Sequence, residues 1–491
     1  MGVEEHAVVV AGSGPVGMML AGELALAGVD VMVVERRPDQ GLAGSRAGGF
    51  QSRTVEVLDQ RGIADRFLAG AQLHRSVMFG GSVLDASDLP TRHPYMVAIW
   101  QNRIERILAD WLADLGLHIR YTCEVTGFEQ DDRSVDVRLA DGKSLRAQYL
   151  VGCDGGRSLI RRVAGIAFPG WDATRSSLIA EVEMSMGPDE DVLRHDAAGV
   201  HAVHRMEDGK TFRVVVTERE IGSSSHATLS ELSEALTAVF GTDYGIHTPT
   251  WISRFTDMTR QAAAYRHRRV LLAGDAAHIH YPAGGQGLSL GVQDAVNLGW
   301  KLAQVVKGTS PDSLLDTYHA ERHPVGARIL KHTVAQAALQ RRDDRTQALV
   351  DFISELTRMK EPRRHIAALM TGLDIHYELG EGHPLLGRRM PDLDLTTTEG
   401  AVRVYELLHD ARPLLLNLGP PRSVEVAGWA DRVRLTDASH EGKWELPVIG
   451  MVSAPTAVLI RPDGYVGWVG NGTQDGLAEA LTAWFGAPTA T

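Results

Sequence analysis

The glycines near the N-terminus have the spacing of a turn that can hold a pyrophosphate. Gly12-Ser13-Gly14-Pro15-Val16-Gly17 follows the apolar stretch AVVVAG and opens MMLAGELALAG, whose apolar residues recur at helical spacing. Glycines permit a tight turn and close approach of the ligand, and a helix N-terminus offers N–H groups and partial positive charge. Glu35 ends the next expected strand, where a carboxylate can accept hydrogen bonds from ribose hydroxyls. The pattern predicts a dinucleotide site but does not distinguish NAD from FAD.

Asp275 and the loop after it are candidates for the same ligand. Asp275 follows the buried stretch RRVLLAG, and open α/β sheets hold ligands at the carboxyl ends of such strands. An N-cap or a loop-stabilising carboxylate is the alternative interpretation of Asp275. The glycines of loop 282–287, PAGGQG, would let the backbone approach a flat ring. A helix beginning near Leu288 would then direct its positive end at that ring.

The histidines and cysteines give little support to metal or thiol chemistry. His278 and His280 would share one face of a strand, but no third ligand cluster is evident, so structural roles are favoured over a metal site. Cys123 and Cys153 are the only cysteines. They are too few for a disulfide framework and suit a reducing cytoplasm.

Charge and hydropathy exclude several classes of partner. The 50 basic and 62 acidic side chains give a formal net charge of −12, whereas nucleic-acid binding needs clustered Lys and Arg. The start, MGVEEHAVVV, is acidic where a signal peptide would be positively charged. Residues 7–34 are apolar but include Glu23, Asp30 and the glycine turn, which disfavours a membrane span. We therefore expect a cytoplasmic chain with no nucleic-acid or membrane partner.

At 491 residues the chain is long enough for two or three domains. It opens with a strand–helix–strand unit, turns antiparallel in its middle, and returns to a buried strand and long helices before a separate α/β segment. The fold class we predict is α/β, a Rossmann-like domain with an inserted antiparallel sheet. The expected segments are 1–170, 171–267, 268–390 and 391–491.

Turn and cap signals support these boundaries. Glu207-Asp208-Gly209 indicates a hairpin between two antiparallel strands, and Thr228 with Glu231 has the spacing of a capping box. Pro462-Asp463-Gly464 indicates a turn between two strands of the last segment, because Pro fixes φ and Gly accepts positive φ.

Three ordered motifs resemble the signatures of one enzyme family. They are GSGPVG, the segment CDGGRS with Asp154, and GDAAH with Asp275. Together they resemble the flavin-dependent aromatic hydroxylases of the para-hydroxybenzoate hydroxylase type. The stretches SRAGGFQSRTVEVLDQRG, AGDAAHIHYPAGGQG and LLDTYHAERHPVG look closest to the actinomycete hydroxylases of aromatic polyketides, the angucycline type. The resemblance covers nearly the whole chain.

The resemblance implies an FAD site built from several segments. In the family the arginine after the second strand, here Arg46, contacts the cofactor near the nicotinamide path. Gln101 matches a glutamine that contacts the flavin, and Val125 matches a position whose backbone meets the adenine. On the residues alone, Arg46 and Gln101 would read as surface polar side chains. The expected cofactor contacts are Gly12, Ser13, Gly14, Pro15, Val16, Gly17, Glu35, Arg36, Arg46, Gln101, Val125, Asp154, Asp275, Pro282, Gly285, Gly287, Leu288 and Ser289.

The resemblance also implies an activity. NAD(P)H, with NADPH preferred, would reduce the FAD, and O₂ would then give a flavin hydroperoxide that hydroxylates a polycyclic aromatic phenol in an apolar pocket roofed by 171–267. No second GxGxxG is present, so NAD(P)H would bind transiently. We name no catalytic base, since nothing ranks His201, His204 and Arg205. A Baeyer–Villiger or epoxidising enzyme, and a flavin-bearing protein that sequesters an aromatic ligand, remain alternatives.

Two features depart from, or add to, the family pattern. Ser289 stands where asparagine is common, and we expect it to act as an N-cap, so that the helix and its dipole survive. The segment 391–491 resembles a thioredoxin fold in which Pro455 occupies the place of the cis-proline, although an ordinary trans proline is equally compatible. No cysteine follows Cys153, so we expect a structural or dimer-related segment without dithiol chemistry.

Overall fold

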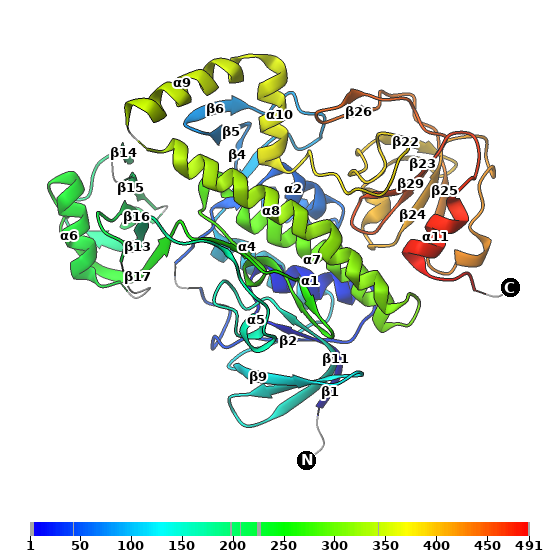
Figure 1. Cartoon of the computed structure of the whole chain (residues 1–491), viewed down its shortest axis with the longest axis horizontal. Coiled ribbons are helices and arrows are strands. Elements are labelled where there is room, and N and C mark those ends of the chain that lie inside the picture. The colour runs from blue at the N-terminus through cyan, green and yellow to red at the C-terminus, as the bar shows by residue number, and fades with distance from the viewer. Residues whose placement is uncertain are drawn as a thin grey trace.

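We analysed a computed structural model of the chain, which describes residues 4–42, 44–196, 199–206, 208–222, 227–341 and 343–489. Figure 1 shows a central body of sheet and long helices with a smaller lobe at each side. The lobe on the left carries α6 and a five-stranded sheet, and the lobe on the right, coloured orange to red, is the C-terminal segment. The two lobes therefore lie on opposite sides of the helices α7 and α8.

The central sheet is mainly parallel, and it follows from the apolar strands that the sequence predicts. β1 pairs in parallel with β2 and β11, and β11 with β20, while β9 and β10 extend β11 as an antiparallel meander. Residues Val8, Val9 and Val10 of β1 are fully buried, as expected of a strand covered on both faces. The strands of this sheet are β1 (Glu4–Ala11), β2 (Val31–Val34), β8 (Ile119–Arg120), β9 (Val125–Gln130), β10 (Val135–Leu139), β11 (Ser144–Gly152), β19 (Arg266–His267) and β20 (Val270–Leu272).

Two helices pack closely beside this sheet because glycines remove side chains from their contact. A Cβ at Gly299 would lie 2.5 Å from the Cβ of Glu23, and a Cβ at Gly291 would lie 2.6 Å from Val16. The helices are α1 (Pro15–Leu26) and α7 (Gly287–Val306). Around them lie α2 (Ser52–Asp59), α3 (Ala64–Leu68), α4 (Gln101–Asp114), α5 (Leu159–Val163), α8 (Asp316–Leu339), α9 (Asp344–Arg358) and α10 (Lys360–Thr371).

The left lobe is a five-stranded antiparallel sheet with α6 against one face. Alternate residues of its strands, such as Val214 and Val216, are buried against Leu232 and Leu236 of α6. Thr228 and Glu231 form the predicted capping box at the start of α6. The elements are β13 (Ser176–Met184), β14 (Val192–His195), β15 (Val200–Arg205), β16 (Thr211–Thr217), β17 (Ile246–Thr256) and α6 (Leu229–Phe240).

Among the described residues before the right lobe, eight short strands lie outside the two larger sheets. They form three small sheets, of which one contacts α7 through β3 and another contacts α10 through β5 and β6. The elements are β3 (Gly49–Phe50), β4 (Gln72–His74) and β7 (Met96–Ala98); β5 (Ser76–Phe79) and β6 (Ser82–Asp85); β12 (Gly170–Trp171), β18 (Thr259–Gln261) and β21 (His278–Ile279).

The right lobe is a four-stranded mixed sheet with a terminal helix, which gives it a thioredoxin-like fold. β24 is parallel to β25 and antiparallel to β28, which pairs with β29. Trp429, Leu459 and Phe485 belong to its apolar core. The elements are β22 (Asp394–Thr397), β23 (Gly400–Arg403), β24 (Leu414–Asn417), β25 (Arg434–Asp437), β26 (Glu445–Leu446), β27 (Gly450–Met451), β28 (Ala457–Ile460), β29 (Val466–Gly470) and α11 (Leu477–Phe485).

The two turns that the sequence predicts between strands are present in the structure. Gly464, at φ +75°, completes the predicted turn between β28 and β29. The hairpin between β15 and β16 is present, although Glu207 itself lies outside the described residues. Among the described residues no peptide bond is cis, so Pro455 is an ordinary trans proline. The fold class is confirmed, and the four segment boundaries stay a prediction.

Two further absences concern only the described part of the chain. No helix there is long and apolar enough to cross a membrane. Cys123 and Cys153 are both free thiols, and burial raises the pKa of each.

Candidate functional site

The carboxyl ends of four neighbouring parallel strands bring the predicted residues to one edge of the central sheet. Ala11, the last residue of β1, is in register with Val34 of β2 and Gly152 of β11, and Gly152 is in register with Leu272 of β20. Whatever follows these strands must therefore share that edge. The residues that follow are Gly12, Glu35, Asp154 and Asp275.

The glycine turn is closed by backbone contacts that leave no room for a side chain at Gly12 or Gly17. Gly12 has φ +106°, and a Cβ there would lie 2.5 Å from the carbonyl oxygen of Cys153. A Cβ at Gly17 would lie 2.0 Å from the carbonyl oxygen of Gly12, whereas a Cβ at Gly14 would meet nothing within 4 Å. Gly14 caps α1 and Pro15 follows, so the N–H groups of Val16 and Gly17 begin the helix without an intrahelical acceptor. The turn thus presents an open, positive helix end, as a pyrophosphate requires.

Glu35 is held as a carboxylate beside this turn. Its Oε2 accepts hydrogen bonds from the Ser13 N–H (2.8 Å) and hydroxyl (3.0 Å), and its Oε1 accepts one from the Arg37 N–H (3.0 Å). Burial raises the pKa of Glu35, but these hydrogen bonds and the Arg37 charge outweigh it and leave the pKa below its ordinary value. An ionised carboxylate has about four acceptor positions. Glu35 can therefore still accept a bond from a ribose hydroxyl.

Asp275 and Asp154 fit a ligand with hydroxyl groups along the same edge. Asp275 is exposed and accepts no hydrogen bond from any described residue. One oxygen of Asp154 accepts from the Ile160 N–H (3.1 Å), whereas its Oδ1 is buried without a partner within the described structure. Buried polar atoms are nearly always hydrogen-bonded, so an orphaned carboxylate oxygen indicates a missing donor. The alternative N-cap role of Asp275 finds no support, since its side chain caps nothing.

The glycine-rich loop before α7 is held from one side by Gln51. The Gln51 amide donates to the Gly284 carbonyl (2.9 Å), and its backbone N–H donates to the Ser289 hydroxyl (3.0 Å). Its Oε1 is buried and has no partner among the described residues. Gly284 and Gly285 have φ of +74° and +62°, which explains why glycine stands at both positions. The backbone of this loop can therefore approach a planar ring closely.

The N-cap role predicted for Ser289 is wrong. α7 begins at Gly287 with Gln286 as its N-cap, so Ser289 is the third helical residue and is buried. Its hydroxyl instead accepts a hydrogen bond from the Gln51 N–H. The first three N–H groups of α7 still lack intrahelical acceptors, as at any helix start. The helix and its dipole therefore begin at Gly287, one residue earlier than predicted.

His278 and His280 each contact a neighbouring group of the protein. Nε2 of His278 lies 2.6 Å from Asp294, a fully buried residue that also pairs with Arg322 at 2.8 Å. Nδ1 of His280 contacts the Tyr281 carbonyl at 2.8 Å. Among the described residues, no group of three His, Cys, Asp or Glu side chains could hold a metal ion.

The structure links Gln101 to the dinucleotide edge through residues that the sequence analysis missed. Gln101 donates to Glu105 (2.9 Å), Glu105 pairs with Arg37 (2.9 Å), and Arg37 also donates to the Ser13 hydroxyl (3.2 Å). Arg36, the predicted contact, is exposed. β2 ends at Val34, so strand alternation gives no signal for Arg37.

Val125 and Arg46 lie at the two ends of the site. β9 begins at Val125, two residues after Cys123, whose N–H donates to the Glu35 carbonyl (2.8 Å). At the other end, Arg46 donates to the Ser253 hydroxyl of β17 (2.9 Å). Burial lowers the pKa of Arg46, and the nearby Asp275 carboxylate opposes this. Arg46 thus lies between the edge of the central sheet and the left lobe.

The face of the five-stranded sheet opposite α6 carries an ion cluster over this end of the site. Arg213 of β16 pairs with Glu181 of β13 (3.2 Å), donates to the Arg46 carbonyl (3.3 Å), and lies 4.7 Å from the centre of the Trp100 ring. Glu181 also accepts from the Ser45 N–H (3.1 Å). The sheet is therefore tied to the loop that carries Arg46.

Strand alternation places the three titratable candidates of the left lobe on different faces of its sheet. His201 is fully buried against Phe240 of α6 and bonds to Asp196 (3.0 Å), and Arg205 lies over Phe212 on the α6 side. His204 lies on the opposite face, near Trp100 and paired with Asp191 (2.5 Å). Of the three, only His204 is on the face that carries the ion cluster.

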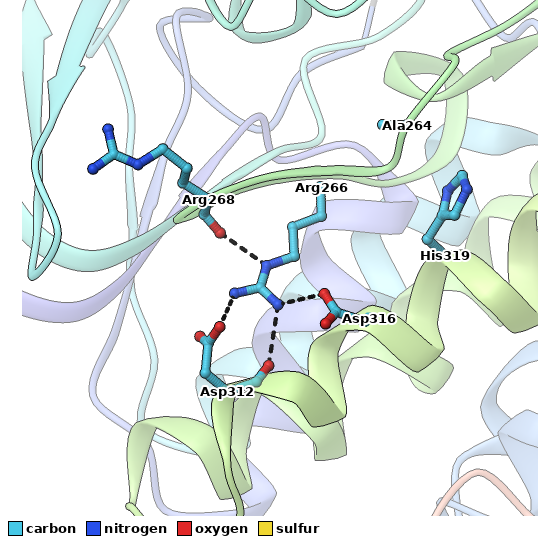
Figure 2. A pocket seen from close by; sticks show the side chains of 6 residues that line it. All are labelled: Ala264, Arg266, Arg268, Asp312, Asp316 and His319. Atoms are coloured by element: carbon cyan, nitrogen blue, oxygen red, sulfur yellow. Dashed lines mark hydrogen bonds and ion pairs between the residues drawn. The ribbon is translucent and has the colours of Figure 1, made fainter.

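A surface pocket elsewhere on the molecule is not part of this site. Figure 2 shows it beside the edge strand β19, where Arg266 donates to the Asp316 carboxylate (2.8 Å), the Asp312 carbonyl (3.0 Å) and the Arg268 carbonyl (2.9 Å). Ala264 and His319 complete its lining. Four of the five guanidinium N–H groups are engaged by these neighbours, counting a contact to the Asp312 carboxylate, so the group serves the fold.

Comparisons with known proteins agree with the geometry. Residues 5–333 match the family described as FAD binding domain, and residues 383–488 match aromatic-ring hydroxylase, C-terminal. A rifampicin monooxygenase of Streptomyces venezuelae is 44% identical over 493 residues, which span 98% of this chain and 99% of the relative. The solved structure of an anhydrotetracycline hydroxylase from Streptomyces rimosus is 42% identical with a TM-score of 0.89, covering 99% of this chain and 100% of that one.

A third relative comes from another pathway. The solved structure of an aromatic hydroxylase from angucycline biosynthesis is 42% identical with a TM-score of 0.90, over 98% of this chain and 99% of that one. The likeness thus spans both lobes and the central body. The chain belongs to the class A flavoprotein aromatic hydroxylases, FAD-dependent monooxygenases that take their electrons from NAD(P)H.

Proposed function

We propose that this enzyme hydroxylates a polycyclic aromatic phenol of the polyketide type, using O₂ and preferring NADPH. The observation that carries this proposal is the position of the five-stranded sheet, whose face opposite α6 lies over the Arg46 end of the dinucleotide edge. Relatives named for rifampicin, for anhydrotetracycline and for angucycline biosynthesis support a large aromatic substrate.

The side chains between the sheet and the loop before α7 suit such a molecule. Phe255 of β17 lies 6.3 Å from Tyr281, which directly precedes loop 282–287. Trp251 lies beneath the Arg46 guanidinium (5.9 Å), and Trp100 lies against Arg213. Aromatic walls bury a flat substrate, and cations beside them favour an electron-rich or anionic ring. These side chains therefore suit a planar phenol better than an aliphatic ligand.

Different predicted contact residues would bind different parts of FAD. The glycine turn and the start of α1 would bind the pyrophosphate, Glu35 the adenosine ribose, and Asp275 the ribityl hydroxyls. When bound, FAD supplies the electron transfer from NADPH and the activation of oxygen. The N–H groups at the start of α7 would stabilise negative charge on the adjacent ring edge. The chain's own part is to orient the substrate and exclude water.

The proposal also covers the location of the enzyme, its oligomeric state and its division into domains. We infer a cytoplasmic enzyme, in keeping with its two free thiols. We infer a homodimer, and we keep the four-segment division in which 171–267 binds the substrate. Size-exclusion chromatography of the purified protein tests the dimer directly.

Regulation of NADPH oxidation by substrate tests the proposal. No second glycine-rich dinucleotide motif is present, so NADPH must reach the flavin transiently, and substrate binding can bias that encounter. We expect NADPH oxidation to be slow alone and faster with a productive polycyclic phenol. Equal rates with and without every substrate that is turned over would contradict the proposal.

The rival functions make different products. A Baeyer–Villiger or epoxidising enzyme would place the oxygen in a ring ester or an epoxide, and a sequestering protein would consume neither NADPH nor O₂ in proportion to ligand. Product structure and the ratio of NADPH to product therefore separate the three.

A further inference from the structure

The turn between β28 and β29 is buried inside the central body of the molecule. Arg461 at its start pairs with Glu321 of α8 through two contacts of 2.7 and 2.8 Å. Asp463 accepts from Arg461 (2.6 Å) and from the Asn297 amide of α7 (3.1 Å). Arg461 and Asp463 are 0% and 2% exposed. Buried charges are tolerated only when they are paired. These ion pairs therefore fix the position of the turn against α7 and α8.

The same turn also holds both ends of α2. Arg53, in the first turn of α2, donates to the Asp463 carbonyl (2.9 Å), pairs with Glu56 (3.2 Å), and is 1% exposed. Arg61, two residues beyond α2, donates to the Pro462 carbonyl (2.7 Å) and pairs with Glu23 of α1 (2.6 Å). The turn therefore fixes where α2 lies relative to α1 and α7.

The first turn of α2 in turn holds the loop predicted to carry the flavin. Gln51, the N-cap of α2, donates its amide to the Gly284 carbonyl (2.9 Å) and its backbone N–H to the Ser289 hydroxyl (3.0 Å). Thr54 adds a longer contact to the Ser289 carbonyl (3.4 Å). Gln51 and Arg53 are two residues apart. One helical turn thus joins the C-terminal lobe to the glycine-rich loop.

We propose that Arg53 is a positioning residue, through which the turn 461–465 of the C-terminal lobe sets the position of loop 282–289 against the flavin ring. The proposal rests on the proposed function, in which that loop contacts the flavin. It gives the C-terminal lobe, which has no cysteine, a part in the reaction without contact to substrate or cofactor.

Arg53→Met and Arg61→Met form a matched pair for the test. Both remove a buried arginine that donates to the turn, but only Arg53 adjoins the residue that holds the loop. Thermal unfolding gives the midpoint of each variant. FAD titration of the apoprotein and the hydrogen peroxide released per NADPH oxidised are then measured well below that temperature. We expect Arg53→Met to weaken FAD binding about tenfold, the scale of one lost hydrogen bond to a charged group, and to raise peroxide release. Arg61→Met should lower the midpoint yet keep both flavin readouts within about twofold.

Two results would overturn the proposal. One is FAD affinity and peroxide release in Arg53→Met that match the wild type, and the other is an equal disturbance of both readouts in Arg61→Met. If Arg53→Met does not fold, Arg53→Lys and Gln51→Ala replace it, and their effects on FAD affinity should be less than additive when combined. Additive effects would then contradict the proposal. A wild-type chain that binds no FAD would instead overturn the proposed function.

Discussion

At the scale of single residues, Asp275 is the clearest test of the cofactor site. Its carboxylate is exposed and has no hydrogen-bond donor among the described residues, so it contributes little to the fold by itself. We expect Asp275→Ala to weaken FAD binding roughly 10- to 100-fold, because it removes hydrogen bonds from ribityl hydroxyls to a charged group. Titration of the apoprotein with FAD measures this.

The control for Asp275→Ala is the thermal midpoint of the apoprotein, which should stay close to that of the wild type. Asp154, also on the dinucleotide edge, is a poor control, since it already accepts a bond from Ile160. FAD affinity that is unchanged in Asp275→Ala would mean that this carboxylate does not touch the cofactor.

Ser289 makes a second residue-scale prediction. Its hydroxyl accepts the Gln51 N–H within a buried helical turn, and an asparagine carbonyl can accept the same bond. We expect Ser289→Asn to bind and reduce FAD with an affinity changed by less than about tenfold, in keeping with one altered neutral hydrogen bond. Photometric titration and the midpoint potential of the flavin measure this. Loss of FAD binding, or a change from inert to active enzyme, would contradict it.

How far the sequence predicts the site differs between backbone and side chains. The glycine turn, Glu35 and Asp275 were predictable, because strand ends and glycine spacing dictate their place. Arg37 is not predictable in this way, because it lies beyond the end of β2 and reaches the site through Glu105 and Ser13. The roles of Gln51 and Arg213 depend on contacts between segments distant in sequence, which periodicity within one segment does not encode.

At the scale of elements, paired buried carboxylates hold neighbouring elements together. Burial raises the pKa of Asp59, Asp294 and Glu321, but their ion-pair and hydrogen-bond partners outweigh it and leave each pKa below its ordinary value. The partners include Arg403 for Asp59, and His278 and Arg322 for Asp294. A group whose pKa is depressed by folding stabilises the native state above its unfolded pKa and loses that effect as pH falls.

These carboxylates predict a loss of stability in acid. The free energy of unfolding should be steady near neutral pH and fall as pH drops below about 4.5, where unfolded carboxyl groups begin to take up protons. Denaturant unfolding between pH 7 and pH 3 measures it. Asp59→Asn, which removes one such group, should start lower at pH 7 and fall less steeply. Stability that is flat or rising from pH 5 to pH 3 would contradict this account.

Most elements were predictable because their sequence patterns are local. The strand–helix–strand opening, the capped helix α6 and the long helix α7 match predicted segments. The start of α7 was misplaced, since a glycine-rich stretch gives no cap signal and the helix begins inside it. The cis or trans state of Pro455 could not be decided from local sequence.

At the scale of the whole molecule, the C-terminal lobe is joined to the central body by buried charges. The sequence predicts a structural or dimer-related segment without chemistry of its own. Removal of residues 395–491 would leave Arg53, Arg61 and Glu321 without partners in the turn. Each of the three keeps a charged partner in the central body, namely Glu56, Glu23 and Lys301. The hydrogen bonds to charged groups that are lost contribute about 1.5–3 kcal/mol each, which together is a large part of a typical stability.

We therefore expect the truncated chain to lose its cooperative unfolding transition and its FAD together. Circular dichroism and the visible flavin spectrum of the purified fragment measure both. A fragment that folds and retains FAD would show that the turn is dispensable. If that fragment also failed to oxidise NADPH with substrate, the lobe would act in the chemistry in some other way.

The central claim is that the chain inserts one atom of molecular oxygen into a polycyclic aromatic phenol. The most direct test is mass spectrometry of such phenols incubated with the FAD-loaded enzyme, NADPH and ¹⁸O₂. The account predicts a phenolic product that carries one labelled oxygen atom, formed in proportion to the NADPH consumed. A product without the label, or one that forms equally well without NADPH or O₂, would contradict it.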